Sequence, residues 1–530
     1  MLFTSSVFLI FLAIVIIACV VTPGKHRWKL LLVASLVFYG VSGPWYLAYI
    51  AATILSTYVC GLRIGKLHRD QEGYLKANKD GLSKEDKKRY KASNKSARAK
   101  WAAACLLLNF IILAVVKYLD FVILNINALF RLTGTGGEIA FFRFALPLGI
   151  SFYTFQTMGY IIDVYRGKQP AVRNPAKLAL FTSFFPQVIQ GPISRFGDLS
   201  ATLFSTDRIT SADISLGLQR VLLGFFKKLI VADRLIIAVK AIVSEQGGDR
   251  GVYFLVVALL YAVTLYADFT GGIDITIGVA QALGVKVKEN FDRPFYAVST
   301  ADYWRRWHIT MGTWFRDYLF YPISVSKPML KLTRFTRAKL GDGFGKRAPV
   351  YISTIVVWFM TGVWHGASWN FVIWGLLNGA ILIISEECTP LYRKFHERTK
   401  AGQLAVYRGF QIARTFCLMS LIRALDIYPN PGNYFKSIGS VFTGFGARRL
   451  FDGSLLHFGL SAADYIIAIA GTTLLVVMGR VGRNEDVRAV LSRRPAAVRY
   501  AVYIAMVLII VVFGAYGNGY DASQFIYNQF

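Results

Sequence analysis

The chain has 530 residues, of which 55% are hydrophobic and 15% aromatic, and its mean hydropathy is +0.45. Many separate apolar runs approach the roughly 20 residues that a membrane-spanning helix needs, which excludes an ordinary soluble domain. The formal charge of +30 would indicate nucleic acid as a ligand of a soluble chain. Here lysines and arginines collect in the connectors between apolar runs, so we expect the lipid bilayer, and no nucleic acid, as a partner.

The apolar runs predict an all-α polytopic membrane protein. The first run lacks a basic segment before it, and its positive charges follow instead, which favours a first transmembrane helix over a secretion signal. Several runs are too short or too interrupted to span, so we expect about 11 spans plus re-entrant or interfacial helices. The runs lie at residues 5–22, 29–42, 44–62, 102–130, 141–163, 176–193, 213–243, 251–282, 350–366, 369–387, 404–422, 459–479 and 498–516.

Basic connectors predict which ends of the spans face the cytoplasm. The clearest is Arg63–Lys100, in which basic residues outnumber acids between two long apolar runs. The positive-inside rule places it in the cytoplasm, and we expect a solvated helical hairpin there. Further basic connectors lie at Lys327–Arg347, Arg393–Lys400 and Arg480–Arg499.

Polar islands interrupt the apolar sequence in its middle third. Phe184–Phe196 carries Gln187 between two prolines, which predicts a broken helix; in a membrane such a break is tolerated only against protein or a water-filled cavity. Tyr266–Gly278 carries Asp268 and Asp274 around two glycines. Six residues place two carboxylates on different faces of one helix, so we expect them to cap a broken helix or to pair with arginines rather than to form an acid/base pair.

The densest polar chemistry lies between Tyr303 and Asn370, where two histidines stand among tryptophans. His308 belongs to Tyr303–Pro322, which is too polar to span and which we expect to lie as an interfacial helix with its tryptophans at headgroup depth. His365 lies inside an apolar run, where ionisable groups are costly and mark function by default. The alternative is that an intramembrane histidine only ties two helices together. The residues expected to support this site are Trp304, Arg305, Trp307, Arg316, Asp317, Trp364, Trp369, Asn370, Asp274 and Gln187.

Two of these supporting groups have specific expectations. Arg316 and Asp317 are expected to form an internal salt bridge rather than a catalytic pair, and Trp364 and Trp369 are expected to form the walls beside His365. The five cysteines show no CxxC spacing, and the chain has no glycine-rich phosphate loop and no G-x-S-x-G motif. The sequence therefore indicates no metal site, no bound cofactor and no serine hydrolase.

Five motifs together resemble the membrane-bound O-acyltransferase superfamily, within it the bacterial branch of alginate O-acetyltransferase membrane subunits and teichoic-acid D-alanyl transfer subunits. They are PLGISFYTFQTMGYIIDVYRG, FFPQVIQGPISRF, YADFTGGIDITIG with KENFDRPF, YWRRWHITMGTWFRDYLFYP and GVWHGASWNFVIWG, in family order from Pro147 to Gly375. The resemblance implies one membrane domain, residues 1–530, with N-terminal helices in 1–146, a catalytic core in 147–375 and C-terminal helices in 376–530. It also implies a ring of tilted helices around a thin centre, with a central tunnel.

The resemblance also implies a chemistry. His365 corresponds to the essential histidine of the family and His308 to the second polar group of its site. The donor would be acetyl-CoA or an acyl-carrier thioester at the cytoplasmic side of a bacterial plasma membrane. The acceptor would be an extracytoplasmic polysaccharide, cell-wall polymer or acetyltransferase partner. A histidine, with an unperturbed pKa near 6.5, suits the base that transfer from a thioester to a hydroxyl needs.

The chain ends in FIYNQF, which is similar to a terminal motif of this bacterial branch. We expect either an aromatic interfacial anchor or a relay in which His365 activates the Tyr527 hydroxyl to carry the acetyl group. Phenolate is a better leaving group than an alkoxide, which suits a carrier ester.

One segment departs from the resemblance. Leu418–Tyr428 retains Arg423 but lacks the aromatic pair expected in alginate-type proteins, which leaves the acceptor open. One alternative is D-alanyl transfer to teichoic acid. Another is a proton-coupled transporter or flippase, in which the histidines and buried acids relay protons. Transporters of that kind often carry internal repeats, and the polar islands of this chain bunch between Ser151 and Asn370 without half-to-half similarity, which favours the enzyme.

Overall fold

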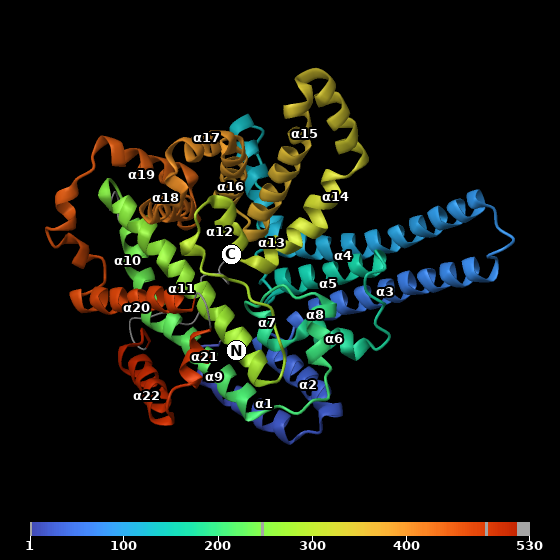
Figure 1. Cartoon of the computed structure of the whole chain (residues 1–530), viewed down its shortest axis with the longest axis horizontal. Helices are drawn as coiled ribbons and strands as arrows, with labels where there is room; N and C mark the ends of the chain where they lie inside the picture. Colours follow the sequence, from blue (N-terminus) through green and yellow to red (C-terminus); the bar gives the residue numbers. More distant parts are fainter. Residues whose placement is uncertain (1–2, 245–248, 483–485, 517–530) are drawn as a thin grey trace. The chain divides into compact units, whose positions relative to one another are not determined.

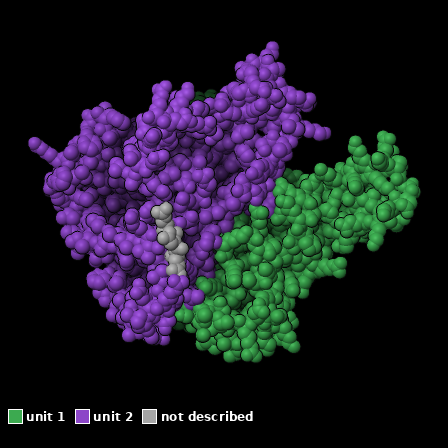
Figure 2. All heavy atoms as spheres, viewed as in Figure 1, with its two compact units in different colours: residues 1, 3–215, 279–288 green, residues 2, 216–278, 289–530 purple. Residues whose placement is uncertain are grey.

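The computed structural model describes residues 3–244, 249–482 and 486–516, and these residues are helical without a β-strand (Figure 1). They form two compact units, coloured separately in Figure 2. Unit 1 contains residues 3–215 and 279–288, and unit 2 contains residues 216–278 and 289–530. The expected all-α polytopic fold is confirmed. The units do not end at residues 146 or 375.

Unit 1 is built on a long helical hairpin, drawn in blue in Figure 1. Helix α3 (Tyr46–Ala77) and helix α4 (Lys84–Thr133) are joined by a short turn. The Ser83 hydroxyl caps α4 by accepting from the amide of Asp86, and Gly134 ends it in the left-handed conformation. The hairpin predicted for the basic connector is therefore confirmed. The preceding helices are α1 (Ser6–Val21) and α2 (Gly24–Ser42).

The proline-rich island of unit 1 is a broken helix, as its sequence predicts. After α5 (Ile150–Tyr165), the chain forms α6 (Pro175–Ser183), the single turn α7 (Phe185–Val188) and α8 (Phe196–Leu203). The Gln187 amide donates to the carbonyl of Pro192 at 3.1 Å and to the hydroxyl of Ser194 at 2.6 Å. Where the helix is interrupted, the Gln187 side chain thus provides a hydrogen bond to a backbone carbonyl that has no helical partner.

Unit 2 carries the histidines. One of its longest helices, α11 (Val252–Ala282), is continuous through Asp268, both glycines and Asp274, so the expected break in this helix is wrong. The glycines are used for close packing instead: a Cβ at Gly271 would lie 2.9 Å from the carbonyl oxygen of Gly224 on α9 (Ser211–Phe225). The other helices of this unit are η1 (Phe226–Ala232), α10 (Asp233–Ser244), η2 (Pro294–Tyr296), α12 (Thr300–Arg306), α13 (Ile309–Phe315), η3 (Arg316–Phe320), α14 (Tyr321–Ser324), α15 (Lys327–His365), α16 (Trp369–Glu387), α17 (Thr389–Thr399), η4 (Ala401–Gln403), α18 (Ala405–Ala424), η5 (Leu425–Ile427), α19 (Pro431–Thr443), η6 (Ala447–Leu450), η7 (Ser454–His457), α20 (Ala462–Val481), α21 (Val487–Ser492) and α22 (Ala496–Phe513).

Within the described ranges, seven helices are long and apolar enough to cross a membrane: α3, α4, α11, α15, α16, α20 and α22. This is fewer than the expected number of about 11. Part of the difference is α1, an apolar helix of only 16 residues. Another part arises where a single apolar run is divided among short helices. Residues 176–193 form α6 and α7, and residues 213–243 form α9, the π-helical η1 and α10.

Helices α15 and α16 form the antiparallel pair that carries His365. Helix α15 turns sharply at Gly341, whose positive φ of 77° suits glycine, and its second half runs to His365. The pair packs through small residues, because a Cβ on Gly362 would lie 2.4 Å from the Phe371 carbonyl oxygen. Arg347 pairs with Glu387 at 3.1 Å, so the C-terminal end of α16 lies beside the part of α15 that directly follows the turn at Gly341.

The Tyr303–Pro322 segment is not the single interfacial helix that its composition predicts. It breaks at His308 into α12 and α13 and continues as η3 and α14. Trp307, His308 and Trp314 are buried in protein rather than placed at headgroup depth. The aromatic residues of this segment thus build a packed site within unit 2.

Candidate active site

His308 occupies a constrained position between two short helices. Its backbone lies in the left-handed region with φ 48° and ψ 52°, which is costly for a residue other than glycine and often marks function. Its side chain has no exposed surface. The neighbouring Asn290 holds it: the amide of Ile309 donates to the Asn290 carbonyl at 2.9 Å, and the amide of Thr310 donates to Oδ1 of Asn290 at 3.0 Å.

The same Asn290 oxygen defines the tautomer of His308. Oδ1 accepts from the amide and hydroxyl of Thr310, which fixes it as an oxygen, and it lies 3.3 Å from Nδ1 of His308. Nδ1 therefore carries the proton in this contact, and the lone pair of the neutral ring is on Nε2. Burial, together with the nearby charge of Arg423, lowers the pKa of His308 to about 3, so the ring is neutral at physiological pH.

His365 is the last residue of α15, directly before the turn into α16. It is buried, with 7% of its surface exposed. Its ring meets that of Trp374 edge to face at 4.7 Å and that of Trp364 at 5.2 Å. Trp364 also meets His308 at 5.9 Å, so one indole contacts both histidines. The structure brings together the two histidines that the sequence singled out.

A buried arginine lies among the tryptophans of this site. The guanidinium carbon of Arg423 is 4.7 Å from the ring centre of Trp374, 5.0 Å from that of Trp307 and 5.7 Å from that of Trp304. Its charge is balanced by Asp426 at 3.2 Å. Cation–π contacts with several indoles hold a guanidinium flat and in place. We call His308, His365, the three indoles above, Trp364 and Arg423 the histidine–tryptophan cluster.

Several buried polar atoms around this cluster have no hydrogen-bond partner among the described residues. They are Nη2 of Arg423, Nε1 of Trp304, Oδ1 of Asn370 and Oδ1 of Asp426. Asn370 is anchored at its other end, where its amide donates to the carbonyl of Asp426 at 3.2 Å. Orphaned polar atoms are rare in protein interiors and indicate that a polar ligand or water completes the site. Two of the four atoms are N–H donors, which suit a carbonyl oxygen.

The remaining predicted supports are divided between the cluster and the surface. Trp304, Trp307, Trp364 and Asn370 belong to the cluster or border it. The side chain of Arg305 is 72% exposed, and the exposed Arg316 forms the predicted salt bridge with Asp317 at 2.9 Å. Trp369 is half exposed, so Trp374, which the sequence did not single out, takes the place expected for it beside His365.

Asp274 and Gln187 lie elsewhere. Asp274 pairs with Arg220 at 3.0 Å and with Lys227 at 2.6 Å, which confirms that it pairs with cations. Asp268 pairs with Lys228 at 2.7 Å. Gln187 belongs to unit 1, where it holds the broken helix. Tyr527 lies outside the described residues.

Arg423 is the residue whose place the sequence did not predict. It was noted only as the survivor of a motif that had lost its aromatic pair. The structure supplies aromatic partners from other parts of the chain, two from the segment around His308 and one from α16. The signal available in the sequence was an arginine directly after the apolar run 404–422.

A buried neutral imidazole at His308, a second buried imidazole at His365, a fixed cation and unfilled N–H donors suit a reaction that takes a proton from a hydroxyl while negative charge grows on a carbonyl oxygen. Acyl transfer is such a reaction. Among the described residues, no group of three or more metal-ligating side chains is present that would indicate a metal centre.

Comparison with known proteins agrees with this class. The family model described as "MBOAT, membrane-bound O-acyltransferase family" matches residues 169–336, which include His308 but end before His365. The chain is 34% identical over 386 residues to a probable alginate O-acetylase AlgI of Azotobacter vinelandii, covering 72% of this chain and 68% of the relative. It is 29% identical over 397 residues to a peptidoglycan O-acetyltransferase of Helicobacter pylori, covering 69% and 66%. It is also 26% identical over 263 residues to a teichoic acid D-alanyltransferase of Streptococcus thermophilus, covering 48% and 60%.

The fold and the cluster thus define a multi-pass membrane protein built for acyl transfer. The chain belongs to the membrane-bound O-acyltransferase family, and it spans about two-thirds of the length of the first two relatives named above. It is an acyltransferase of that family.

Proposed function

We propose that this acyltransferase moves an acetyl group from a cytoplasmic thioester, acetyl-CoA or an acyl-carrier thioester, to an acceptor outside a bacterial plasma membrane. The observation that carries the proposal is the pair of buried histidines joined by Trp364, with unfilled N–H donors beside them. Neutral bases and oxyanion donors in a water-poor site are what acyl transfer to a hydroxyl requires.

His365 is the general base of this proposal. A nitrogen with a pKa of about 3 is a weak base, which assigns His308 to orienting the acceptor or thioester through Nε2. His365 takes the proton of the acceptor hydroxyl while its oxygen forms a bond to the acetyl carbonyl carbon. The C–S bond then breaks, and the proton passes from His365 to the leaving thiolate. Arg423 and the Trp304 N–H stabilise the oxyanion of the intermediate.

The acceptor of the first step is the Tyr527 hydroxyl in this proposal. The acetyl group then passes from the tyrosine ester to a hydroxyl of an extracytoplasmic polysaccharide, cell-wall polymer or partner acetyltransferase, and the phenolate recovers a proton. The sequence resemblance of the terminal FIYNQF motif supports this relay. The alginate and peptidoglycan acetyltransferases among the relatives favour acetyl over D-alanyl transfer.

The test is incubation of the purified protein with labelled acetyl-CoA, followed by peptide mass spectrometry. We expect label on Tyr527 in the wild type and none in His365→Ala. Wild-type levels of label in His365→Ala would overturn the role of that histidine. Unchanged transfer to acceptor by Tyr527→Phe, which keeps the ring and removes the hydroxyl, would overturn the relay and leave direct transfer.

A further inference from the structure

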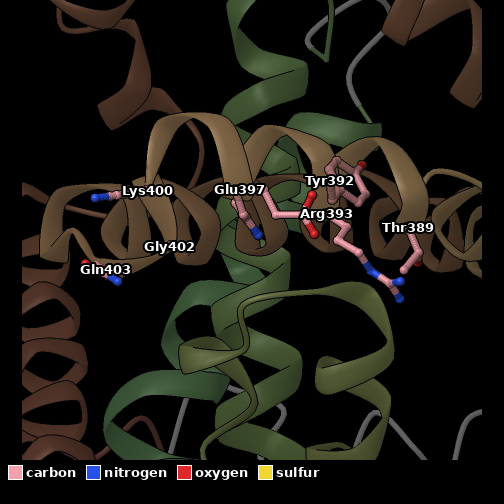
Figure 3. A pocket seen from close by; sticks show the side chains of 8 residues that line it. Thr389, Tyr392, Arg393, Glu397, Lys400, Gly402 and Gln403 are labelled. Carbon is pink, nitrogen blue, oxygen red and sulfur yellow. The ribbon is translucent and has the colours of Figure 1, made fainter.

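Helix α17 and the turn that follows it form a cleft outside the histidine–tryptophan cluster (Figure 3). The cleft has a volume of about 660 Å³. Its helical lining recurs every three or four residues, which places these side chains on one face of the helix. The lining residues are Thr389, Tyr392, Arg393, His396, Glu397, Lys400, Gly402 and Gln403.

The cations of this cleft are not neutralised by the protein. Arg393 and Lys400 are exposed, and neither forms an ion pair with any residue that the structure describes. Together with Lys394 and Arg398 they give the segment four cations against one acid, Glu397. Arg393 and Lys400 stand seven residues apart, about 10 Å along a helix, and Figure 3 shows them on opposite sides of Glu397.

The opposite side of α17 is apolar in part. Leu391 is 65% exposed and Phe395 is 45% exposed, and Tyr392 lies between this flank and the cleft. Lys394 and Arg398 share this face with Leu391 and Phe395, so the flank is mixed. Its apolar side chains can reach the acyl chains of a bilayer surface while the long cationic side chains extend to the headgroups. Further exposed apolar residues follow at the start of α18, where Leu404 and Val406 are 58% and 86% exposed.

The position of α17 in the chain places it at such a surface. It begins two residues after the candidate span α16 ends at Glu387. Glu387 pairs with Arg347 and accepts from the Tyr351 hydroxyl, so this end of α16 lies beside the basic connector Lys327–Arg347. The positive-inside rule assigns that side to the cytoplasm, where the leaflet carries anionic lipid.

We propose that the cleft between α17 and η4 is a binding site for the headgroup of an anionic phosphoglycerol lipid. Arg393 binds the phosphate, Lys400 adds positive charge at the other end of the cleft, and Glu397, Gln403 and Thr389 supply acceptors and donors for the glycerol hydroxyls. Leu391 and Phe395 contact the acyl chains. The site does not depend on the acyl-transfer chemistry, since none of these residues belongs to the histidine–tryptophan cluster.

The experiment is native mass spectrometry of the purified full chain released from detergent, with phosphatidylglycerol as the probe and phosphatidylcholine of the same acyl chains as the reference. We expect wild-type protein to retain phosphatidylglycerol preferentially and Arg393→Gln/Lys400→Gln to lose at least tenfold of that retention. The control Lys331→Gln/Lys339→Gln removes two exposed cations from the neighbouring basic connector and is expected to retain the lipid.

Two results would overturn the proposal. One is equal loss of phosphatidylglycerol in the two double variants, which would show attraction by net charge alone. The other is retention of phosphatidylglycerol by Arg393→Gln/Lys400→Gln while binding of free CoA is lost, which would assign the cleft to a soluble anion. Glycerol 3-phosphate, added as a competitor, distinguishes a lipid site from a site for a free phosphate compound. If the site binds the lipid, glycerol 3-phosphate is expected to displace phosphatidylglycerol only at concentrations far above that of the lipid. Matching melting temperatures of the variants exclude misfolding.

Discussion

Two groups of buried polar side chains in unit 2 differ in how their charges are used. Around η1, Lys228 lies 2.7 Å from both Asp233 and Asp268, and Arg220 and Lys227 both pair with Asp274. In the histidine–tryptophan cluster, one cation meets one carboxylate, and the remaining contacts are aromatic faces, neutral imidazole and unfilled donors.

The comparison separates a structural group from a reactive one. Buried charges are stable only when partners replace the water they have lost, so the η1 ion pairs hold helices together. Donors without a partner in the histidine–tryptophan cluster lower the stability of the fold. Active sites often contain such donors, because a bound ligand then forms the missing hydrogen bonds. Burial of ionisable residues alone therefore does not identify the site. Unfilled donors together with two histidines and a cation held against indole faces do.

The largest effect is expected from His365→Ala. Removal of a general base costs about 10²- to 10⁴-fold in rate, so acetyl transfer from labelled acetyl-CoA should fall by that factor. The fold should survive, because the side chain contacts ring edges and leaves no buried charge unpaired. Circular dichroism and melting temperature provide the control. Loss of helicity with loss of activity would show that His365 only ties α15 to α16.

Lys228→Ala should lower the stability of the fold and leave the activity of the folded protein nearly unchanged. The variant leaves Asp268 and Asp233 as uncompensated buried carboxylates, and breaking a buried pair in this way costs about 3–5 kcal/mol. We expect a large fall in melting temperature and in yield, with near-normal transfer per folded molecule. The exposed Lys331→Ala is the control and should change neither quantity. If the Lys228 variant is stable but inactive, the ion pairs around η1 take part in catalysis rather than only in stability.

The sequence predicted the class of fold, the hairpin in Arg63–Lys100 and the broken helix around Gln187, because apolar run length, basic connectors and prolines act locally. It also predicted that His308 and His365 belong to one site, and in the structure both rings contact Trp364. It placed the break in α11 wrongly, because glycine in a membrane helix also serves close packing, and which use applies depends on the neighbouring helix.

The part that could not be predicted is the assembly of the cluster from distant segments. The three indoles over Arg423 come from two stretches of sequence on either side of the long α15, and the arginine lies beyond both. No periodicity links these positions, since their contact depends on how α12, α16 and α18 pack. The exposure of Trp369 and the burial of Trp374, five residues later, follow from the same packing.

Arg423→Lys tests whether the fixed, planar cation matters within the reactive group. Lysine keeps the charge and the pairing with Asp426 but loses the flat face that lies against three indoles and the second donor of the fork. We expect kcat to fall about tenfold, equivalent to roughly 1.4 kcal/mol, with little change in KM for the thioester. Arg408→Lys, an exposed arginine on the same helix, is the control. An unchanged kcat would restrict Arg423 to packing.

The last expected effect is confined to acidic pH: a dependence of stability on pH that originates at His308. Its pKa in the folded protein is lowered to about 3, whereas an unfolded histidine titrates near 6.5. The unfolded chain therefore binds the additional proton between these values, so stability falls as pH decreases from 6.5 toward 3, by at most about 1.4 kcal/mol per pH unit. The melting temperature in detergent should decline by a few degrees over that window.

The substitution His308→Asn should flatten this slope, whereas His457→Asn, at an exposed position, should leave it unchanged. An equal slope in all three proteins would mean that His308 is already protonated in the folded state, and then it could donate but not accept in the site. A flattened slope keeps His308 neutral throughout the working range. Any loss of transfer activity near pH 6 would then have to come from protonation of another group. Asp426, which pairs with Arg423, is such a group, because burial raises its pKa to about 6.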